Sequence, residues 1–190
     1  MAARSIKISF TLDESDIAYF RGLHRETRKN TAAEDQPEVI RKVRKLIDEV
    51  RGAKKAPGFV LEAVSTLEDL LRILEDEDYA VPKPVAARAL TALAYFANPA
   101  DLIPDHLPGL GFLDDAIMIK LVEEEFKDEL WGYRKFRDFR EGSEQRHWTA
   151  VAKQRQAGRL AAKRREIRSK IEERQAARED QGPRRLLRGW

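Results

Sequence analysis

The sequence predicts an all-α fold, in which a compact helical domain carries one short N-terminal strand and a long basic helical tail. Three observations lead to this prediction. Apolar residues recur at helical spacing in five segments before residue 141, strict apolar–polar alternation is confined to residues 6–12, and the charge changes near residue 141. Residues 141–190 contain 14 Lys and Arg against 7 Asp and Glu, whereas residues 1–140 contain 22 against 26. We therefore predict a domain over residues 1–140 and a charged tail over residues 141–190.

The first element in the chain is the predicted strand. Ile6, Ile8, Phe10 and Leu12 alternate with polar residues, which is the period of a half-buried strand. A single strand leaves backbone donors and acceptors unpaired, and the same strand of a second copy would pair them under two-fold symmetry. We therefore predict a homodimer through the Ile6–Leu12 strand.

Five helices follow the strand. The segment from Thr11 to Glu14 offers a capping box for the first, which begins near Asp13, and Pro37 suits the first position of the second. The fourth is rich in alanine, which permits close helix approach, so we expect it to be the most buried. In order, the five helices are predicted over about 13–27, 37–50, 58–75, 82–97 and 113–133.

Composition excludes several classes of protein. The chain has 190 residues and no cysteine, which rules out disulfides, thiolate metal sites and a cysteine nucleophile. The N-terminal residues lack the apolar core of a secretion signal, and no apolar run reaches the ~18 residues that a membrane-spanning helix needs. We therefore predict a cytoplasmic protein without a transmembrane helix.

The loop between the last two of these helices, with its flanks, is the most distinctive stretch. Residues 95–118 read YFANPADLIPDHLPGLGFLDDAIM and contain three prolines, two glycines and four aspartates. The pattern Asn-Pro-x-Asp-Leu-Ile-Pro-Asp, followed by Pro-x-x-Gly-x-x-Asp-Asp-Ala, resembles the signature of the YkvA-like family, a domain of unknown function. The matching positions are Pro99, Asp101, Ile103, Pro104, Asp105, Pro108, Gly111, Asp114 and Asp115. The resemblance implies no particular activity, since the family has no agreed one.

The four aspartates of the motif have two interpretations. They could bind a hard cation such as Mg²⁺ or Ca²⁺, with His106 as an acid–base group, or they could accept hydrogen bonds from backbone N–H groups at helix starts. The chain contains no EF-hand spacing, His-Glu-x-x-His motif or glycine-rich phosphate loop. We therefore favour the structural role and predict no metal or cofactor. The candidate site residues are Pro99, Asp101, Pro104, Asp105, His106, Pro108, Gly111, Asp114 and Asp115.

The tail offers a candidate surface for a polyanion. Its positive charge could attract nucleic acid or an anionic membrane, although interleaved glutamates also suit a plain salt-bridged helix. Its apolar residues fit neither a continuous helical face nor a heptad, so we expect a solvated arm. The candidate polyanion-binding residues are Arg146, Trp148, Lys153, Arg155, Arg159, Lys163, Arg164 and Arg165.

The family resemblance also implies a membrane hypothesis, because several YkvA-like proteins are described as membrane proteins with the motif joining two apolar segments. Here Arg88, Lys120 and residues 123–125 place charges in those segments, which opposes insertion. We expect a non-enzymatic interaction or scaffold module with a protein partner, whose basic tail contacts an anionic partner. The alternatives are a small metal-dependent or acid–base enzyme and a peripheral membrane protein.

Overall fold

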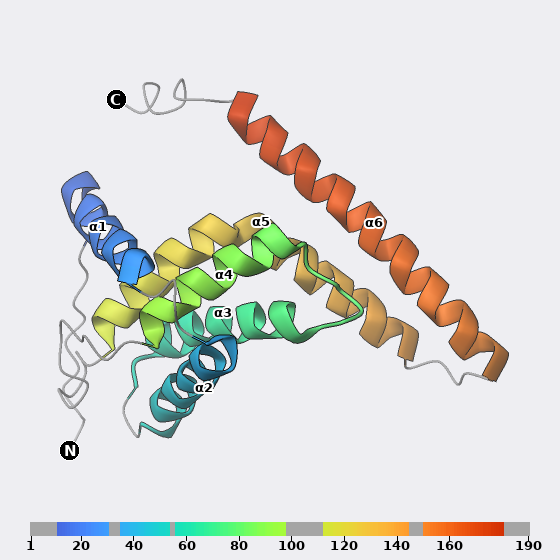
Figure 1. Cartoon of the computed structure of the whole chain (residues 1–190), viewed down its shortest axis with the longest axis horizontal. Coiled ribbons are helices and arrows are strands. Elements are labelled where there is room, and N and C mark those ends of the chain that lie inside the picture. The colour runs from blue at the N-terminus through green and yellow to red at the C-terminus, as the bar shows by residue number, and fades with distance from the viewer. Residues whose placement is uncertain (1–10, 31–34, 54–55, 98–111, 145–149, 181–190) are drawn as a thin grey trace, which may run out of the picture.

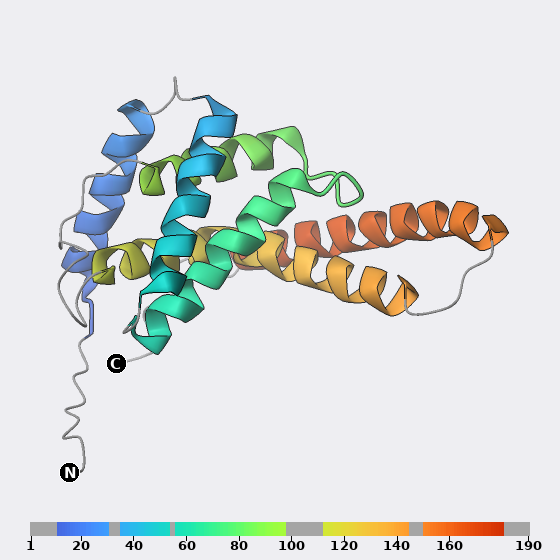
Figure 2. The same cartoon turned by 90° about the horizontal axis from the view of Figure 1, so that it is seen from below.

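A computed structural model describes residues 11–30, 35–53, 56–97, 112–144 and 150–180. These residues form helices that pack around α3 and the long α5 (Figures 1 and 2). The helices are α1 (Glu14–Asn30), α2 (Gln36–Gly52), α3 (Gly58–Glu75), α4 (Lys83–Phe96), α5 (Leu113–Glu144) and α6 (Ala150–Asp180).

The predicted all-α fold is confirmed, but the predicted N-terminal strand is wrong. No strand occurs in the described residues, and Thr11 and Leu12, the described end of the Ile6–Leu12 segment, lie in neither a strand nor a helix. Residues 1–10 lie outside the described part. Alternation alone does not make a strand, because a strand needs a partner with free backbone groups, and each element described here is a helix. The structure does not test the homodimer predicted through this segment.

Hydrogen bonds of a local capping motif mark the start of α1. The N–H groups of Ser15 and Asp16 donate to Asp13 Oδ1 at 2.7 and 3.0 Å, and the N–H of Asp13 donates to Asp16 Oδ2 at 3.0 Å. This reciprocal pair is a capping box. It lies two residues after the predicted box, although the helix begins where the sequence places it.

The predicted inner face of α2 is confirmed, whereas the prediction for α4 is wrong. Val39, Val43, Ile47 and Val50 of α2 are buried. In α3, nine of 18 residues are buried, against five of 14 in α4. The reason is that none of the first six residues of α4 is buried, whereas buried residues run along α3 from Val60 to Ile73.

Helix α5 continues past residue 140, the predicted end of the helical domain, to Glu144. Helix α6 then returns antiparallel to α5, and the two lie side by side as a long hairpin (Figure 2). No helix in the described ranges has an apolar stretch long enough to cross a membrane.

The expectation that the tail is a solvated arm is wrong for α6. Leu160, Ile167 and Ile171 are buried. A Cβ atom added to Gly132 of α5 would lie 2.6 Å from Ile171 Cδ1 and 2.9 Å from Ile167 Cγ2. The glycine therefore permits the close approach of the two helices.

Candidate functional site

Only the last two residues of the predicted motif site lie in the described part of the chain. Asp114 and Asp115 occupy the first turn of α5, where the helix dipole favours carboxylates, and Asp114 is buried. Among the described residues no group of three His, Asp or Glu side chains is placed to hold a metal ion. The remaining motif residues lie outside the described ranges: Pro99, Asp101, Ile103, Pro104, Asp105, His106, Pro108 and Gly111. The gathering of the four aspartates therefore stays untested.

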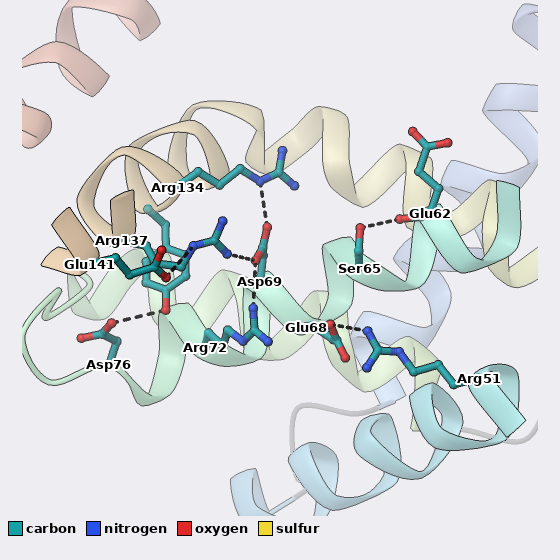
Figure 3. A network of polar contacts seen from close by, with 11 residues as sticks. Arg51, Glu62, Ser65, Glu68, Asp69, Arg72, Asp76, Arg134, Arg137 and Glu141 are labelled. Atoms are coloured by element: carbon teal, nitrogen blue, oxygen red, sulfur yellow. Dashed lines mark hydrogen bonds and ion pairs between the residues drawn. The ribbon is translucent and has the colours of Figure 1, made fainter. Parts of the chain in front are cut away.

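A polar cleft of about 370 Å³ between α3 and α5 gathers several charged side chains. Four carboxylates and four cations line it, so the summed charge of the lining is zero. The cations are not evenly spread, because three arginines lie together around one aspartate (Figure 3). The lining residues are Glu62, Ser65, Thr66, Glu68, Asp69, Arg72, Lys120, Glu123, Arg134 and Arg137.

Asp69 is the aspartate at the centre of these arginines. Arg134 Nε donates to Asp69 Oδ2 at 2.7 Å, and Arg137 Nη1 donates to Oδ1 at 3.3 Å. Arg72 Nη1 lies 3.8 Å from Oδ1, which is an ion pair without a hydrogen bond. Asp69 is 6% exposed, whereas the side chain of Arg134 is 42% exposed. Three cations and one carboxylate give this cluster a charge of +2, which Glu141, 3.7 Å from Arg137 Nε, lowers to +1 for the surroundings.

Two of the other carboxylates of the cleft already have a cation beside them. Arg51 Nη2 lies 2.7 Å from Glu68 Oε2 (Figure 3), and Lys120 Nζ lies 2.7 Å from Glu123 Oε2. The excess of positive charge is therefore local to the Asp69 cluster.

Asp76, the residue after α3, differs from Asp69 in its partners. Both of its carboxylate oxygens accept hydrogen bonds from groups that hold the turn. Tyr133 Oη donates to Asp76 Oδ2 at 3.3 Å, and Arg140 Nη1 lies 2.8 Å from the same oxygen. The N–H of Tyr79 donates to Oδ1 at 3.0 Å. Burial, followed by the charge of Asp76, raises the pKa of the Tyr133 phenol. This carboxylate therefore fixes the turn after α3 against α5.

Glu129 of α5 is the carboxylate that holds α6. Tyr79 Oη donates to Glu129 Oε1 at 2.6 Å, and Arg168 Nη1 donates to Oε2 at 2.7 Å. The guanidinium carbon of Arg168 also lies 4.5 Å from the centre of the Tyr79 ring. Burial, with the charge of Glu129 second, raises the pKa of the Tyr79 phenol strongly. One buried cluster thus joins the α3–α4 turn, α5 and α6.

A second charged contact joins the same two helices nearer the end of α6. Arg174 Nε donates to Asp128 Oδ1 at 2.7 Å, and Arg178 donates to the same oxygen. The guanidinium of Arg174 lies 4.6 Å from the Trp131 ring centre. The basic residues on this side of α6 therefore meet acidic residues of the chain itself.

The candidate polyanion-binding residues lie in several different surroundings. Arg146 and Trp148 lie outside the described residues, and Lys153 and Arg155 belong to α6. Arg159 and Lys163 lie 5.8 and 5.6 Å from the centre of the Phe139 ring. Arg164 Nη1 donates to the Asp78 carbonyl oxygen at 2.9 Å, and Arg165 is exposed.

Comparison with known proteins identifies the family. Residues 85–121 match the family described as "Protein of unknown function (DUF1232)". The "Uncharacterized membrane protein YkvA" of Bacillus subtilis (strain 168) is 36% identical over 78 residues, which are 40% of this chain and 74% of that protein. The chain belongs to the YkvA-like, or DUF1232, family. The resemblance inferred from the motif is therefore confirmed at the level of the family. No solved structure matches the chain.

The DUF1232 model covers only part of the cleft. Residues 85–121 contain most of α4 and the start of α5, so they include Lys120 but neither Asp69 nor Arg134. The Asp69 cluster and helix α6 therefore lie outside residues 85–121, which the DUF1232 model matches.

Sequence reasoning missed the Asp69 cluster. A signal for it exists on each helix, since Thr66, Asp69 and Ile73 follow one another at three- and four-residue spacing and are all buried. On α5, Arg134 and Arg137 share a face for the same reason. Neither pattern predicts that Asp69 pairs with Arg134, which lies 65 positions later in the sequence. The site depends on that pairing.

Proposed function

We propose that this YkvA-like chain is a non-enzymatic interaction module that holds an anionic group of a partner in the cleft between α3 and α5. The observation that carries this proposal is the meeting of three guanidinium groups on the single carboxylate of Asp69. Guanidinium groups bind carboxylate and phosphate through paired N–H donors. Because Arg72 and Arg134 are about half exposed, an incoming anion reaches them without unfolding the bundle.

The tail is the other surface proposed to contact an anionic partner, nucleic acid or membrane. Along α6, Arg164, Arg168 and Arg174 are engaged with backbone or carboxylate oxygens of the preceding helices and turn. The carboxylate contacts of Arg168 and Arg174 lower the charge that α6 offers to an outside partner. The cleft therefore has the better support as the anionic site, with exposed Arg165 as the tail residue to test against it.

Retention on immobilised heparin, a polyanionic probe, tests the two surfaces against each other. We expect Arg134→Gln with Arg137→Gln to elute at lower salt than wild type, because exposed charge interactions are screened by salt. Arg165→Gln should elute nearly as wild type does. If Arg165→Gln has the larger effect and the cleft variant has none, the anionic site lies in the tail instead.

A peripheral membrane protein is the second candidate function. Phe59 and Leu61 in the first turns of α3 are 47% and 43% exposed, and the Bacillus relative is named a membrane protein. Exposed aromatic and aliphatic side chains next to charged residues suit a membrane surface. Liposome flotation should weaken in Phe59→Ser with Leu61→Ser but not in Tyr19→Ser, a matched control on α1 that is 57% exposed. Equal flotation of all three proteins would remove this candidate.

The enzyme alternative rests on the motif aspartates and His106. Its test is the melting temperature of the wild type with and without a chelator, because a filled metal site stabilises the fold by mass action. A fall on chelation that Mg²⁺ or Ca²⁺ reverses would favour a metal-dependent enzyme. We expect no change on chelation, and similar losses of stability in Asp101→Asn and Asp114→Asn.

A further inference from the structure

We infer that the ligand of the cleft is a tetrahedral anion of the phosphate class, held by Arg72, Arg134 and Arg137 beside Asp69. This inference rests on the anion-binding function proposed above and adds the chemistry of the ligand. The three arginines come from two helices, α3 and α5, whose packing fixes their approach (Figure 3).

The arginines keep most of their hydrogen-bond donors available. A guanidinium group has five N–H donors. Arg134 contacts Asp69 through Nε, and Arg72 approaches it only through Nη1 at 3.8 Å. Arg137 contacts Asp69 through Nη1 and lies 3.7 Å from Glu141 through Nε. The remaining nitrogens can therefore donate to a ligand while Asp69 stays in place.

The local charge favours an anionic ligand. The Asp69 cluster carries +2, and Glu141, which lies 3.7 Å from Arg137 Nε, lowers the local charge to +1. Glu68 and Glu123 are each paired with a cation of their own. Glu62 is exposed, and Figure 3 draws it beyond Ser65 from the arginines, so its charge is open to screening by salt.

The arrangement of donors favours a tetrahedral group over a planar one. One guanidinium fork satisfies the two oxygens of a carboxylate, whereas a phosphate presents further oxygens in other directions. The three guanidinium groups approach Asp69 from different sides, so their remaining donors suit a ligand with oxygens in several directions (Figure 3). The cleft volume of about 370 Å³ falls in the range of small-ligand sites, about 300–1,000 Å³.

Calorimetric titration of the full chain with inorganic phosphate, at an ionic strength held constant with sodium chloride, tests the inference. We expect phosphate binding by wild type and about tenfold weaker binding by Arg134→Gln, because charge-assisted hydrogen bonds are lost. Arg41→Gln is the matched control, since Arg41 forms an exposed ion pair with Glu38 on α2, away from the cleft. If Arg134→Gln fails to fold, Arg134→Lys replaces it, which keeps the charge but loses the fork and should still weaken binding.

Two further titrations show whether a failed result concerns the ligand class or the anion-binding function, and whether the phosphate belongs to a lipid. Acetate bound as tightly as phosphate, and lost in Arg134→Gln, would overturn the tetrahedral ligand while leaving the anion-binding function intact. Vesicles of phosphatidylcholine with phosphatidate, against phosphatidylcholine alone, test a lipid phosphate. Binding to the phosphatidate vesicles alone, lost in Arg134→Gln, would support the inference with a lipid headgroup as the source. If neither anion nor either vesicle binds through Arg134, both the inference and the proposed function fail.

Discussion

Two carboxylate–arginine clusters in this chain have similar chemistry and different surroundings. In the α3–α5 cleft, Asp69 meets arginines whose side chains are 30–53% exposed. Between α5 and α6, the side chains of Glu129 and Arg168 are 6% and 19% exposed, and Tyr79 covers them. Exposed ion pairs contribute about 0–1 kcal/mol, whereas removing one partner of a buried pair costs about 3–5 kcal/mol. The buried cluster therefore fixes a helix, whereas the open cluster leaves its arginines accessible to the anion proposed above.

Removal of α6 should have the largest effect on stability. Deletion of residues 145–190 exposes the surface that Leu160, Ile167 and Ile171 cover, and each such side chain contributes about 1.5–3 kcal/mol when buried. We expect the free energy of unfolding to fall by about 5 kcal/mol in urea denaturation. An unchanged midpoint would show that the tail is a separate unit, as the charge pattern alone suggests.

Single substitutions compare the two clusters directly. Glu129→Gln leaves Arg168 buried without its counter-charge and should cost about 3 kcal/mol. Asp69→Asn leaves arginines that water can reach and should cost about 1 kcal/mol. Urea denaturation of both variants provides the measurement. Equal losses would mean that exposure does not distinguish the clusters.

The close approach at Gly132 should matter less than the buried charge. Gly132→Leu places a side chain against Ile167 and Ile171, and overpacking of this kind costs about 1–3 kcal/mol. Gly142→Leu is the matched control on the same helix, since nothing lies within 4 Å of a Cβ there. That control should be neutral or slightly stabilising, because leucine favours a helix over glycine. A stable Gly132→Leu protein would contradict the close packing of α5 and α6.

The helix positions follow from the sequence because their causes are local. Apolar spacing predicts α3 within the bounds that the structure shows, and Pro37 marks the first turn of α2. The strand prediction failed because alternation over residues 6–12 says nothing about a partner. The capping box begins at Asp13 and not at the predicted Thr11, because Asp16, three residues after Asp13, completes it.

The docking of α6 could not be predicted from apolar periodicity. Among the residues of α6 whose burial is described, Leu160, Ile167 and Ile171 are the buried apolar ones, and they share a helical face at spacings of seven and four. Most other residues of that face are charged, so the pattern resembles a solvated helix. The buried face of α6 can be identified only from its contacts on α5. Glu129 pairs with Arg168, and Gly132 leaves space for Ile167 and Ile171.

The smallest expected effect is that of the Tyr79 hydroxyl, and it depends on pH. Tyr79→Phe loses one hydrogen bond to Glu129 and should cost about 1 kcal/mol near neutral pH. Burial and Glu129 raise the pKa of Tyr79 above the ordinary value of about 10, so the folded state keeps the phenol protonated where the unfolded chain ionises. The wild type should therefore lose stability as the pH rises above about 10, and Tyr79→Phe should lose it less steeply. Parallel declines would show that this phenol does not carry the effect.

The most direct test of the difference between the clusters is a pair of double-mutant cycles. One cycle combines Glu129→Gln with Arg168→Met, and the other combines Asp69→Asn with Arg134→Met, each followed by urea denaturation. We predict a coupling free energy of about 2 kcal/mol or more for the buried Glu129–Arg168 pair and less than about 1 kcal/mol for the Asp69–Arg134 pair. Equal couplings, or a larger one at Asp69, would contradict the assignment of α6 docking to the buried cluster and of ligand binding to the open one.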